Sequence, residues 1–279
     1  MKSLSLVSGA KCLLIALFIT GTSYPVYGDI VATYSPAGSQ TPDTSTGPTG
    51  LCTGTTGCWV GMQTFASSTA PTGTWNFPSI VSSGTVLTDP ISGAITGTFS
   101  GTGLFINPAN LYGGAGGTGY YADVTKASYT LTLGTTGNIP GDNYFGLWFS
   151  ALDNGNDLKF YDGSTLLLDF TPALFQKLTG ACPNAFCGNP NSQFLGQDGN
   201  EQFAFLNFFD TTGYITSIVF TETTSAGFES DNFTAAYQDP SNPSGTLIGG
   251  TPEPSSFVLM LSGILALIAI GRRAALKMM

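Results

Sequence analysis

The fold class of this chain is indicated by residues 144–163, which read Tyr144-Phe-Gly-Leu-Trp-Phe-Ser-Ala-Leu-Asp-Asn-Gly-Asn-Asp-Leu-Lys-Phe-Tyr-Asp-Gly. The first nine residues are mostly apolar and aromatic, which predicts a long buried strand. The run Asp153-Asn-Gly-Asn-Asp157 has the composition of a tight turn, and Asp162-Gly163 closes the strand-like run that follows. Two strands joined and closed by turns within so short a stretch predict antiparallel β structure.

Similar strand-like runs continue on both sides of this stretch. No periodic helix interrupts them beyond a turn predicted over Pro172 to Leu178. Short strands closed by turn residues are typical of an antiparallel sandwich, here expected over residues 59–240 and of the jelly-roll kind. The further runs are 94–99, 103–108, 129–133, 165–170, 202–209, 215–222 and 233–237.

The N-terminus has the pattern of a secretory signal peptide over residues 1–28. Lys2 and Lys11 precede the apolar stretch 12–20, and Val26 and Gly28 fit the positions before a signal-peptidase cleavage site. Residues 29–58 follow as a leader rich in Gly, Ser, Thr and Pro. The signal predicts export through the Sec translocon and cleavage by signal peptidase.

The C-terminus carries a second hydrophobic segment after a linker over residues 241–250. Pro252, Glu253 and Pro254 form an extended motif, because proline denies a helical conformation to the residue before it. The apolar run 257–270 spans roughly 21 Å as a helix, against about 30 Å for a bilayer core. Arg272 and Arg273 follow it and favour the cytoplasmic side. A sorting signal, a permanent anchor and a soluble core helix are the three interpretations.

Residues 251–279 resemble the PEP-CTERM sorting signal of Gram-negative bacteria. That resemblance implies recognition and processing by the membrane protease exosortase, after transient insertion into the inner membrane. Residues 144–163, 203–209 and 227–232 also resemble a group of exosortase-dependent surface proteins whose bodies are similar to jelly-roll carbohydrate-binding modules. The resemblance implies a location at the cell surface or in the extracellular matrix, and it brings no ligand with it.

Composition restricts the function of the exported part. The segment 29–250 holds three of the eight basic residues and sixteen of the seventeen acidic ones, so its net charge is −13. Such a surface repels nucleic acids and anionic lipids, so we expect no nucleic-acid partner. The chain has no histidine, which removes the commonest general base, the usual Ser and Cys triads and most zinc sites. We therefore expect that this protein is not an enzyme.

The cysteines predict disulfides. Cys12 lies in the signal peptide, and the other four form two close pairs, Cys52 with Cys58 and Cys182 with Cys187. An exported chain is oxidised, so these thiols are expected to pair. Spacing alone does not choose among the three pairings, although the turn residues inside each pair favour local bonds. A tetrathiolate zinc site is the alternative, and it is typical of a reducing compartment.

Acidic loops raise the question of a structural calcium ion. Asp153 and Asp157 lie in one predicted turn, while Glu229 and Asp231 lie two residues apart and share a face of an extended segment. Calcium prefers several carboxylate and amide oxygens on a bent loop, and some of these four residues are candidate ligands. The other interpretation is that Asp and Asn only form the turns.

Aromatic side chains are candidates for stacking on sugar rings. Alternating aromatic residues in strands are more typical of a core, and the Phe residues of 203–209 are assigned to it. The candidates are Tyr120, Tyr121, Tyr144, Trp148, Tyr161 and Tyr237.

Together these features predict an exported, exosortase-processed surface or matrix protein. Its sandwich is expected to be structural or to associate with exopolysaccharide. The alternative is a calcium-assisted, glycan-cleaving extracellular enzyme on a jelly-roll fold.

Overall fold

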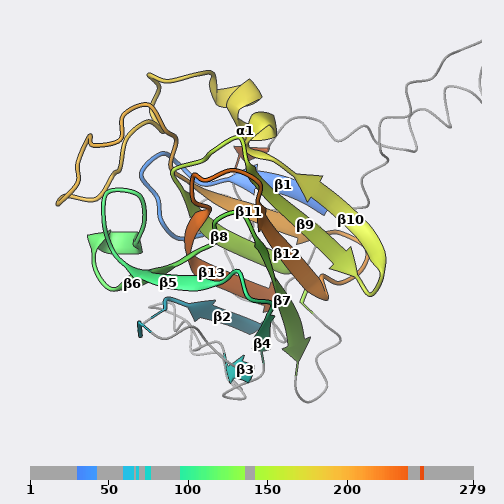
Figure 1. Cartoon of the computed structure of the whole chain (residues 1–279). Helices are drawn as coiled ribbons and strands as arrows, with labels where there is room; N and C mark the ends of the chain where they lie inside the picture. The colour runs from blue at the N-terminus through green and yellow to red at the C-terminus, as the bar shows by residue number, and fades with distance from the viewer. Residues whose placement is uncertain are drawn as a thin grey trace, which may run out of the picture.

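The computed structural model describes residues 30–42, 59–65, 67–68, 73–76, 95–135, 142–237 and 246–247. Within these ranges the chain is mostly β, and its strand pairs are antiparallel, which confirms the predicted all-β class (Figure 1). The turn expected over Pro172 to Leu178 is an α-helix, α1 (Pro172–Thr179), which begins with proline. The strands are β1 (Ile30–Tyr34), β2 (Trp59–Gln63), β3 (Gly73–Asn76), β4 (Ile95–Ser100), β5 (Phe105–Pro108), β6 (Tyr120–Asp123), β7 (Ser128–Thr135), β8 (Tyr144–Ser150), β9 (Asn156–Asp162), β10 (Thr165–Phe170), β11 (Ala204–Asp210), β12 (Ser217–Glu222), β13 (Glu229–Tyr237) and β14 (Thr246–Leu247).

The strands form two sheets that enclose a common core, as in a sandwich. The eight-stranded sheet has the order β14-β1-β11-β8-β13-β6-β5, with β2 also paired to β13. The six-stranded sheet has the order β10-β9-β12-β7-β4-β3. Consecutive strands often belong to different sheets, so the chain crosses repeatedly between the two layers.

The pairing from β6 to β13 is nested. β9 pairs with β10, β8 with β11, β7 with β12, and β6 with β13. This part of the chain therefore behaves as one long antiparallel hairpin whose successive strand pairs alternate between the two sheets. The turn at Asp162-Gly163 is its tip, as the sequence predicts, and Gly163 has the left-handed φ of 55° that favours glycine.

Two strands of the larger sheet come from segments that the sequence assigns to the leader and the linker. β1 lies within residues 29–58 and pairs along its length with β11, from Ile30 opposite Asp210 to Tyr34 opposite Leu206. β14 lies within residues 241–250 and pairs with β1. Ile30 is 1% exposed, so β1 contributes to the core while covering the open edge of β11.

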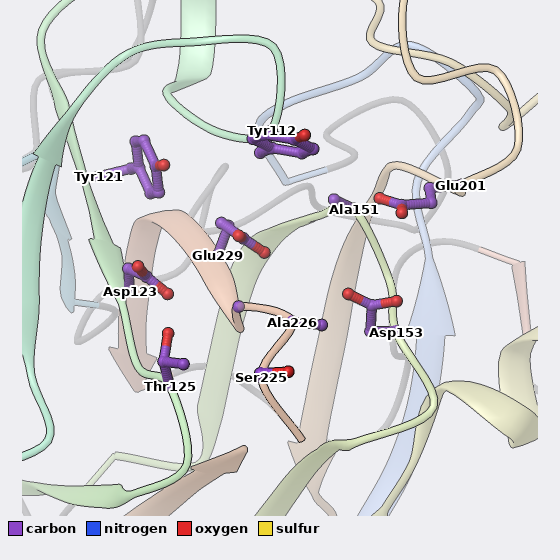
Figure 2. Close-up of a pocket in the computed structure, with 11 residues that line it drawn as sticks. Tyr112, Tyr121, Asp123, Thr125, Ala151, Asp153, Glu201, Ser225, Ala226 and Glu229 are labelled. Carbon is purple, nitrogen blue, oxygen red and sulfur yellow. The ribbon is translucent and has the colours of Figure 1, made fainter. Parts of the chain in front are cut away.

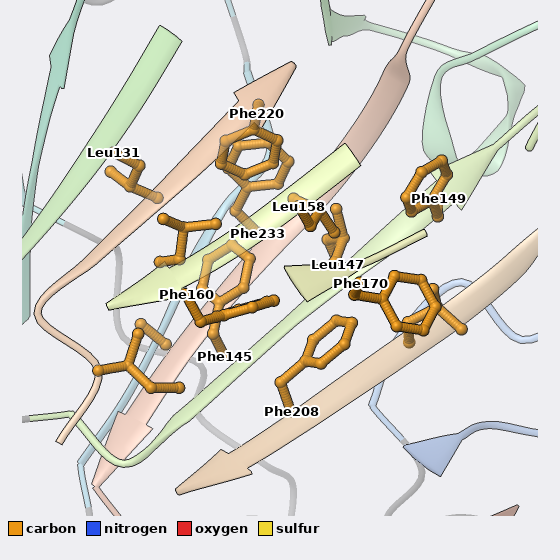
Figure 3. Packing of buried hydrophobic residues seen from close by; sticks show 14 of the residues in the cluster. Leu131, Phe145, Leu147, Phe149, Leu158, Phe160, Phe170, Phe208, Phe220 and Phe233 are labelled. Atoms are coloured by element: carbon orange, nitrogen blue, oxygen red, sulfur yellow. The ribbon is translucent and has the colours of Figure 1, made fainter. Parts of the chain in front are cut away.

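Aromatic rings fill the space between the sheets (Figure 3). Phe233 of β13 stacks on Phe220 of β12 at 5.1 Å and meets Phe145 of β8 at 5.7 Å. It also contacts Phe65 at 5.1 Å and Phe99 of β4 at 6.4 Å. One ring thus joins strands of both sheets.

The larger sheet is buried on both faces at its centre, which explains the continuous apolar run of β8. Phe145, Leu147 and Phe149 face the main core. The alternate residue Trp148 packs on the outer face against Phe203, with 6.0 Å between ring centroids. All seven residues of β8 are buried as a result.

A loop over residues 180–203 covers part of this sheet and contains a disulfide near its start. Cys182 and Cys187 are bonded, with their Cα atoms 5.8 Å apart, in agreement with the predicted local pairing. Phe186 of this loop packs edge-on against Phe175 of α1 at 5.1 Å and against Tyr34 at 5.5 Å. The loop, the helix and β1 are therefore held together by aromatic contacts.

Truncating Phe233 tests the role of this ring. We expect Phe233→Ala to lower the free energy of unfolding by about 3–5 kcal/mol, because it leaves a cavity between the sheets. Urea denaturation measures the change. The control Leu195→Ala alters a side chain that is 72% exposed, and its effect should stay within about 0.5 kcal/mol. Equal losses in the two variants would contradict the central role of Phe233.

Candidate functional site

A cavity of about 490 Å³ opens at one end of the larger sheet (Figure 2). Its size is within the range of small-molecule sites. Its walls contain carboxylates, hydroxyls and two tyrosine rings, and no Lys or Arg. The lining residues are Tyr112, Tyr121, Asp123, Thr125, Ala151, Asp153, Glu201, Ser225, Ala226, Gly227 and Glu229.

The antiparallel register brings these residues together. Ser230 of β13 lies opposite Ala122 of β6, and Glu229 lies opposite Ser150 of β8. Ala204 of β11 lies opposite Phe149 of β8. The carboxyl ends of β6 and β8 therefore adjoin the amino ends of β11 and β13. Each of these four strand ends contributes a carboxylate, namely Asp123, Asp153, Glu201 and Glu229.

Glu229 occupies the centre of the site. Its side chain is 7% exposed, and Oε2 has no hydrogen-bond partner. Figure 2 shows its carboxyl group between that of Asp123 on one side and those of Asp153 and Glu201 on the other. Asp123 accepts a hydrogen bond from Asn107 Nδ2 at 2.8 Å through Oδ2, while its Oδ1 has no partner. Two buried acceptor oxygens are thus left without donors in the cavity wall.

Gly227 makes room for these two carboxyl groups. A Cβ atom at this position would lie 2.0 Å from Glu229 Oε1 and 2.9 Å from Asp123 Oδ1. A side chain here would overlap the carboxyl groups in the positions that they occupy, so glycine permits their close approach. Both carboxyl groups therefore converge on the backbone at Gly227.

Asn156 fixes the two loops that carry Asp153 and Gly227. Its Oδ1 accepts a hydrogen bond from the Asp153 backbone N at 2.8 Å, and its Nδ2 donates to the Gly227 carbonyl at 2.9 Å. Nδ2 also donates to Glu222 Oε2 at 2.5 Å. Asn156 is 1% exposed, so this bridge is shielded from water. The predicted turn over 153–157 therefore also positions a wall of the cavity.

The tyrosine wall is held by side-chain amides. Asn110 Oδ1 accepts a hydrogen bond from the Tyr112 backbone N at 2.8 Å, and its Nδ2 donates to the Tyr121 hydroxyl at 3.0 Å. Asn189 Nδ2 donates to the Leu111 carbonyl at 2.9 Å. The Tyr112 side chain is 44% exposed at the cavity, whereas Tyr121 is 2% exposed. Tyr112 thus offers an accessible ring on a fixed loop.

Burial raises the acid pKa values in the cavity. The pKa of Glu229 is raised to about 9, chiefly by burial and further by the charges of Asp123, Asp153 and Glu201. The pKa of Glu201 is raised to about 7, first by burial and then by Asp198 and Asp153. Burial also raises the pKa of Asp123 and of Asp153. At neutral pH Glu229 therefore retains a proton that an exposed carboxylate loses.

The four predicted calcium ligands do not converge on one point. Asp153 and Glu229 line the cavity. Asp157 instead forms an ion pair with Lys159, and Asp231 accepts hydrogen bonds from the backbone N of Ala115 at 2.8 Å and of Asn232 at 2.7 Å. Asp231 therefore anchors the loop before β6. Within the described ranges, no three acidic or cysteine side chains are grouped closely enough to hold a metal ion.

The aromatic candidates divide in a similar way. Trp148 and Tyr144 are fully buried and belong to packing clusters on the outer face of the larger sheet. Tyr121 lines the cavity, whereas Tyr112, which sequence reasoning missed, has the more exposed ring. Sequence reasoning also missed Asp123 and Glu201 as candidates. The signal that could have identified the two acidic residues is that each lies at or near the end of a strand.

No family model matches this sequence, and no curated protein is significantly similar to it. None of the helices in the described ranges is long and apolar enough to cross a bilayer. The predicted signal peptide, Cys52, Cys58, and the sorting residues Pro252 to Pro254, Arg272 and Arg273 lie outside those ranges.

Glu229 should make stability depend on pH. Its pKa is raised in the folded state, so the unfolded chain releases this proton first, and stability falls as pH rises from about 4.5 to about 9. We expect Glu229→Gln to stabilise the protein at pH 8 by on the order of 1–3 kcal/mol, because the amide mimics the protonated acid. At pH 4 the two proteins should unfold alike.

Chemical denaturation at both pH values measures the difference between the variant and the wild type. Asp162→Asn is the control, since this carboxylate is exposed and lies outside the cavity. A Gln variant that is less stable than the wild type at pH 8 would show that Glu229 is ionised and stabilising.

Proposed function

We propose that this chain is an exported bacterial surface or extracellular-matrix protein that associates with polysaccharide through the cavity at Glu229. The observation that carries the proposal is that one cavity contains both the accessible Tyr112 ring and carboxylate oxygens without hydrogen-bond partners. Tyrosine faces stack on sugar rings, and carboxylates accept hydrogen bonds from sugar hydroxyls. A site with this composition binds a polar ring better than an apolar ligand.

The export and sorting steps in this proposal are inferred from the N-terminal and C-terminal segments of the sequence. Residues 1–28 would direct the chain to the Sec translocon and signal peptidase. The motif Pro252-Glu253-Pro254, the apolar run 257–270 and the pair Arg272 and Arg273 would then present it to exosortase in the inner membrane. The Cys182–Cys187 disulfide suits the oxidising compartment beyond that membrane.

The finer fold assignment in this proposal is a jelly roll. Its support is the nested pairing of the eight strands from β6 to β13, divided equally between two sheets. A long hairpin wound in this way gives the two Greek keys of a jelly roll. Many extracellular domains with this architecture place their sites on loops at one end, as the cavity is here.

Glycan cleavage is the second candidate function, and one observation favours it. The raised pKa of Glu229, about 9, keeps this carboxyl protonated at neutral pH, as a general acid requires. Asp153 and Glu201 lie across the cavity and could act as the ionised partner. Binding without turnover remains our first proposal, because binding needs only the acceptors and the ring.

Intact-mass analysis of the secreted protein tests the sorting proposal. We expect the mature chain to begin at Asp29 and to lack residues 257–279. Replacing Pro252, Glu253 and Pro254 by alanine should leave the full C-terminus in place and retain the protein in the inner membrane fraction. Recovery of residues 257–279 in the mature extracellular protein would contradict processing.

Binding to immobilised polysaccharides tests the cavity. We expect Tyr112→Ala to weaken binding about 2- to 10-fold, since stacking on a ring contributes about 0.5–1.5 kcal/mol. The control Leu166→Ala removes a side chain that is also 44% exposed but lies on β10, outside the cavity. Reducing ends released by the wild type and not by Glu229→Gln would replace the binding proposal with glycan cleavage.

A further inference from the structure

We infer that the cavity selects a sugar carrying a protonated amino group, over neutral and acidic sugars. This inference rests on the proposed saccharide-binding function and specifies its ligand class. The cavity sets four carboxylates, Asp123, Asp153, Glu201 and Glu229, around one space of about 490 Å³.

The cavity wall is rich in acceptors and poor in donors. Its side-chain hydroxyl donors are those of Tyr112, Tyr121, Thr125 and Ser225. Glu229 Oε2 and Asp123 Oδ1 have no hydrogen-bond partner. A buried acceptor without a donor costs about 1–3 kcal/mol, which a ligand with N–H donors recovers. An ammonium group offers three such donors and a positive charge.

Charge excludes acidic polysaccharides from this site. None of the three lysines in the described ranges, Lys126, Lys159 and Lys177, lines the cavity. A uronate or sulfate would therefore enter a space walled by carboxylates with no cation to neutralise it. Buried charges of like sign repel strongly, because the interior screens them less than water does.

A metal ion fits the cavity less well than an amino sugar. Calcium needs six to eight oxygens at about 2.3–2.6 Å from one point. Within the described ranges no three acidic side chains meet in this way. The cavity is also large enough for a sugar ring, and the exposed ring of Tyr112 offers that ring a stacking surface.

The test compares a charged amino sugar with its neutral, N-acetylated counterpart. A glucosamine trimer and its fully N-acetylated counterpart are titrated into the full domain by calorimetry at a pH of about 6, where a primary amine is protonated. We expect the glucosamine trimer to bind at least about 10-fold tighter, with an advantage that shrinks as salt is added. A neutral glucose trimer should bind no better than the acetylated one.

Variants distinguish binding in the cavity from nonspecific binding to the acidic surface. Glu229→Gln and Gly227→Ala should each reduce the affinity for the glucosamine trimer about 10-fold, the first because an amide cannot ionise when the ammonium group binds and the second because it displaces the carboxyl groups. The fold should tolerate Gly227→Ala, because the atoms that must move are the ends of side chains. Asp162→Asn removes an exposed charge and should leave the affinity unchanged. Circular dichroism confirms that each variant is folded.

Other outcomes overturn the inference in distinguishable ways. Equal binding of the charged and acetylated trimers, weakened by Tyr112→Ala, would leave saccharide binding intact and remove the amine preference. Tighter binding of a trilysine peptide than of the glucosamine trimer would assign the site to cationic peptides. Calcium that competes with the trimer would show a metal site. Absence of binding to any of these sugars would remove the proposed function together with its ligand class.

Discussion

The contact of Phe233 with rings from both sheets is the constraint on which the rest of the structure depends. Phe220 and Phe99 approach it from the six-stranded sheet, and Phe145 from the eight-stranded one. Because Phe233 lies on β13, this contact sets which residues of β13 face inward, and a shift of one residue would turn them all outward. An irregularity between Asp231 and Thr234 then shifts the register of β13, and beyond it Glu229 lies opposite Ser150, beside the ends of β6 and β8. The geometry of the cavity thus depends on the packing of the core and on this shift.

The loops around the cavity are held mainly by side-chain amides. Asn110, Asn156, Asn189 and Asn191 each donate to or accept from backbone groups of loops that have no regular structure. Amides satisfy buried backbone groups without adding charge. In the described part of the chain the ion pairs are those of Lys159 with Asp157 and Asp169, on the surface of the six-stranded sheet. The field inside the cavity therefore comes from its own carboxylates.

Local sequence was sufficient to predict the strands in which burial on one or both faces imposes a single pattern of apolar residues. The alternation over 129–133 and the apolar run from Tyr144 correspond to β7 and β8, and Asp162-Gly163 forms the predicted turn. β1 was not predicted, because its five residues precede a long stretch rich in Gly, Ser, Thr and Pro, and only its pairing with β11 identifies it as a strand.

The cavity was harder to predict because its four carboxylates are spread over residues 123–229. Asp153 and Glu229 were named from local loops, but Asp123 and Glu201 join them only through strand pairing. Asp231 has the same chemistry as Glu229 and yet serves to hold a loop.

The direction in which β14 runs determines how the domain is presented. Thr246 lies opposite Tyr34 and Leu247 opposite Thr33, so β14 heads toward the Ile30 end of β1. Ile30 lies opposite Asp210, at the end of β11 that is remote from Glu201 and the cavity. Both the start of β1 and the exit from β14 are therefore at the end of the sheet opposite the cavity. If the domain is tethered through its C-terminal segment, the end of the sheet near Ile30 would face the attachment point and the cavity would face the medium. Attachment and ligand binding would then use opposite ends of the domain.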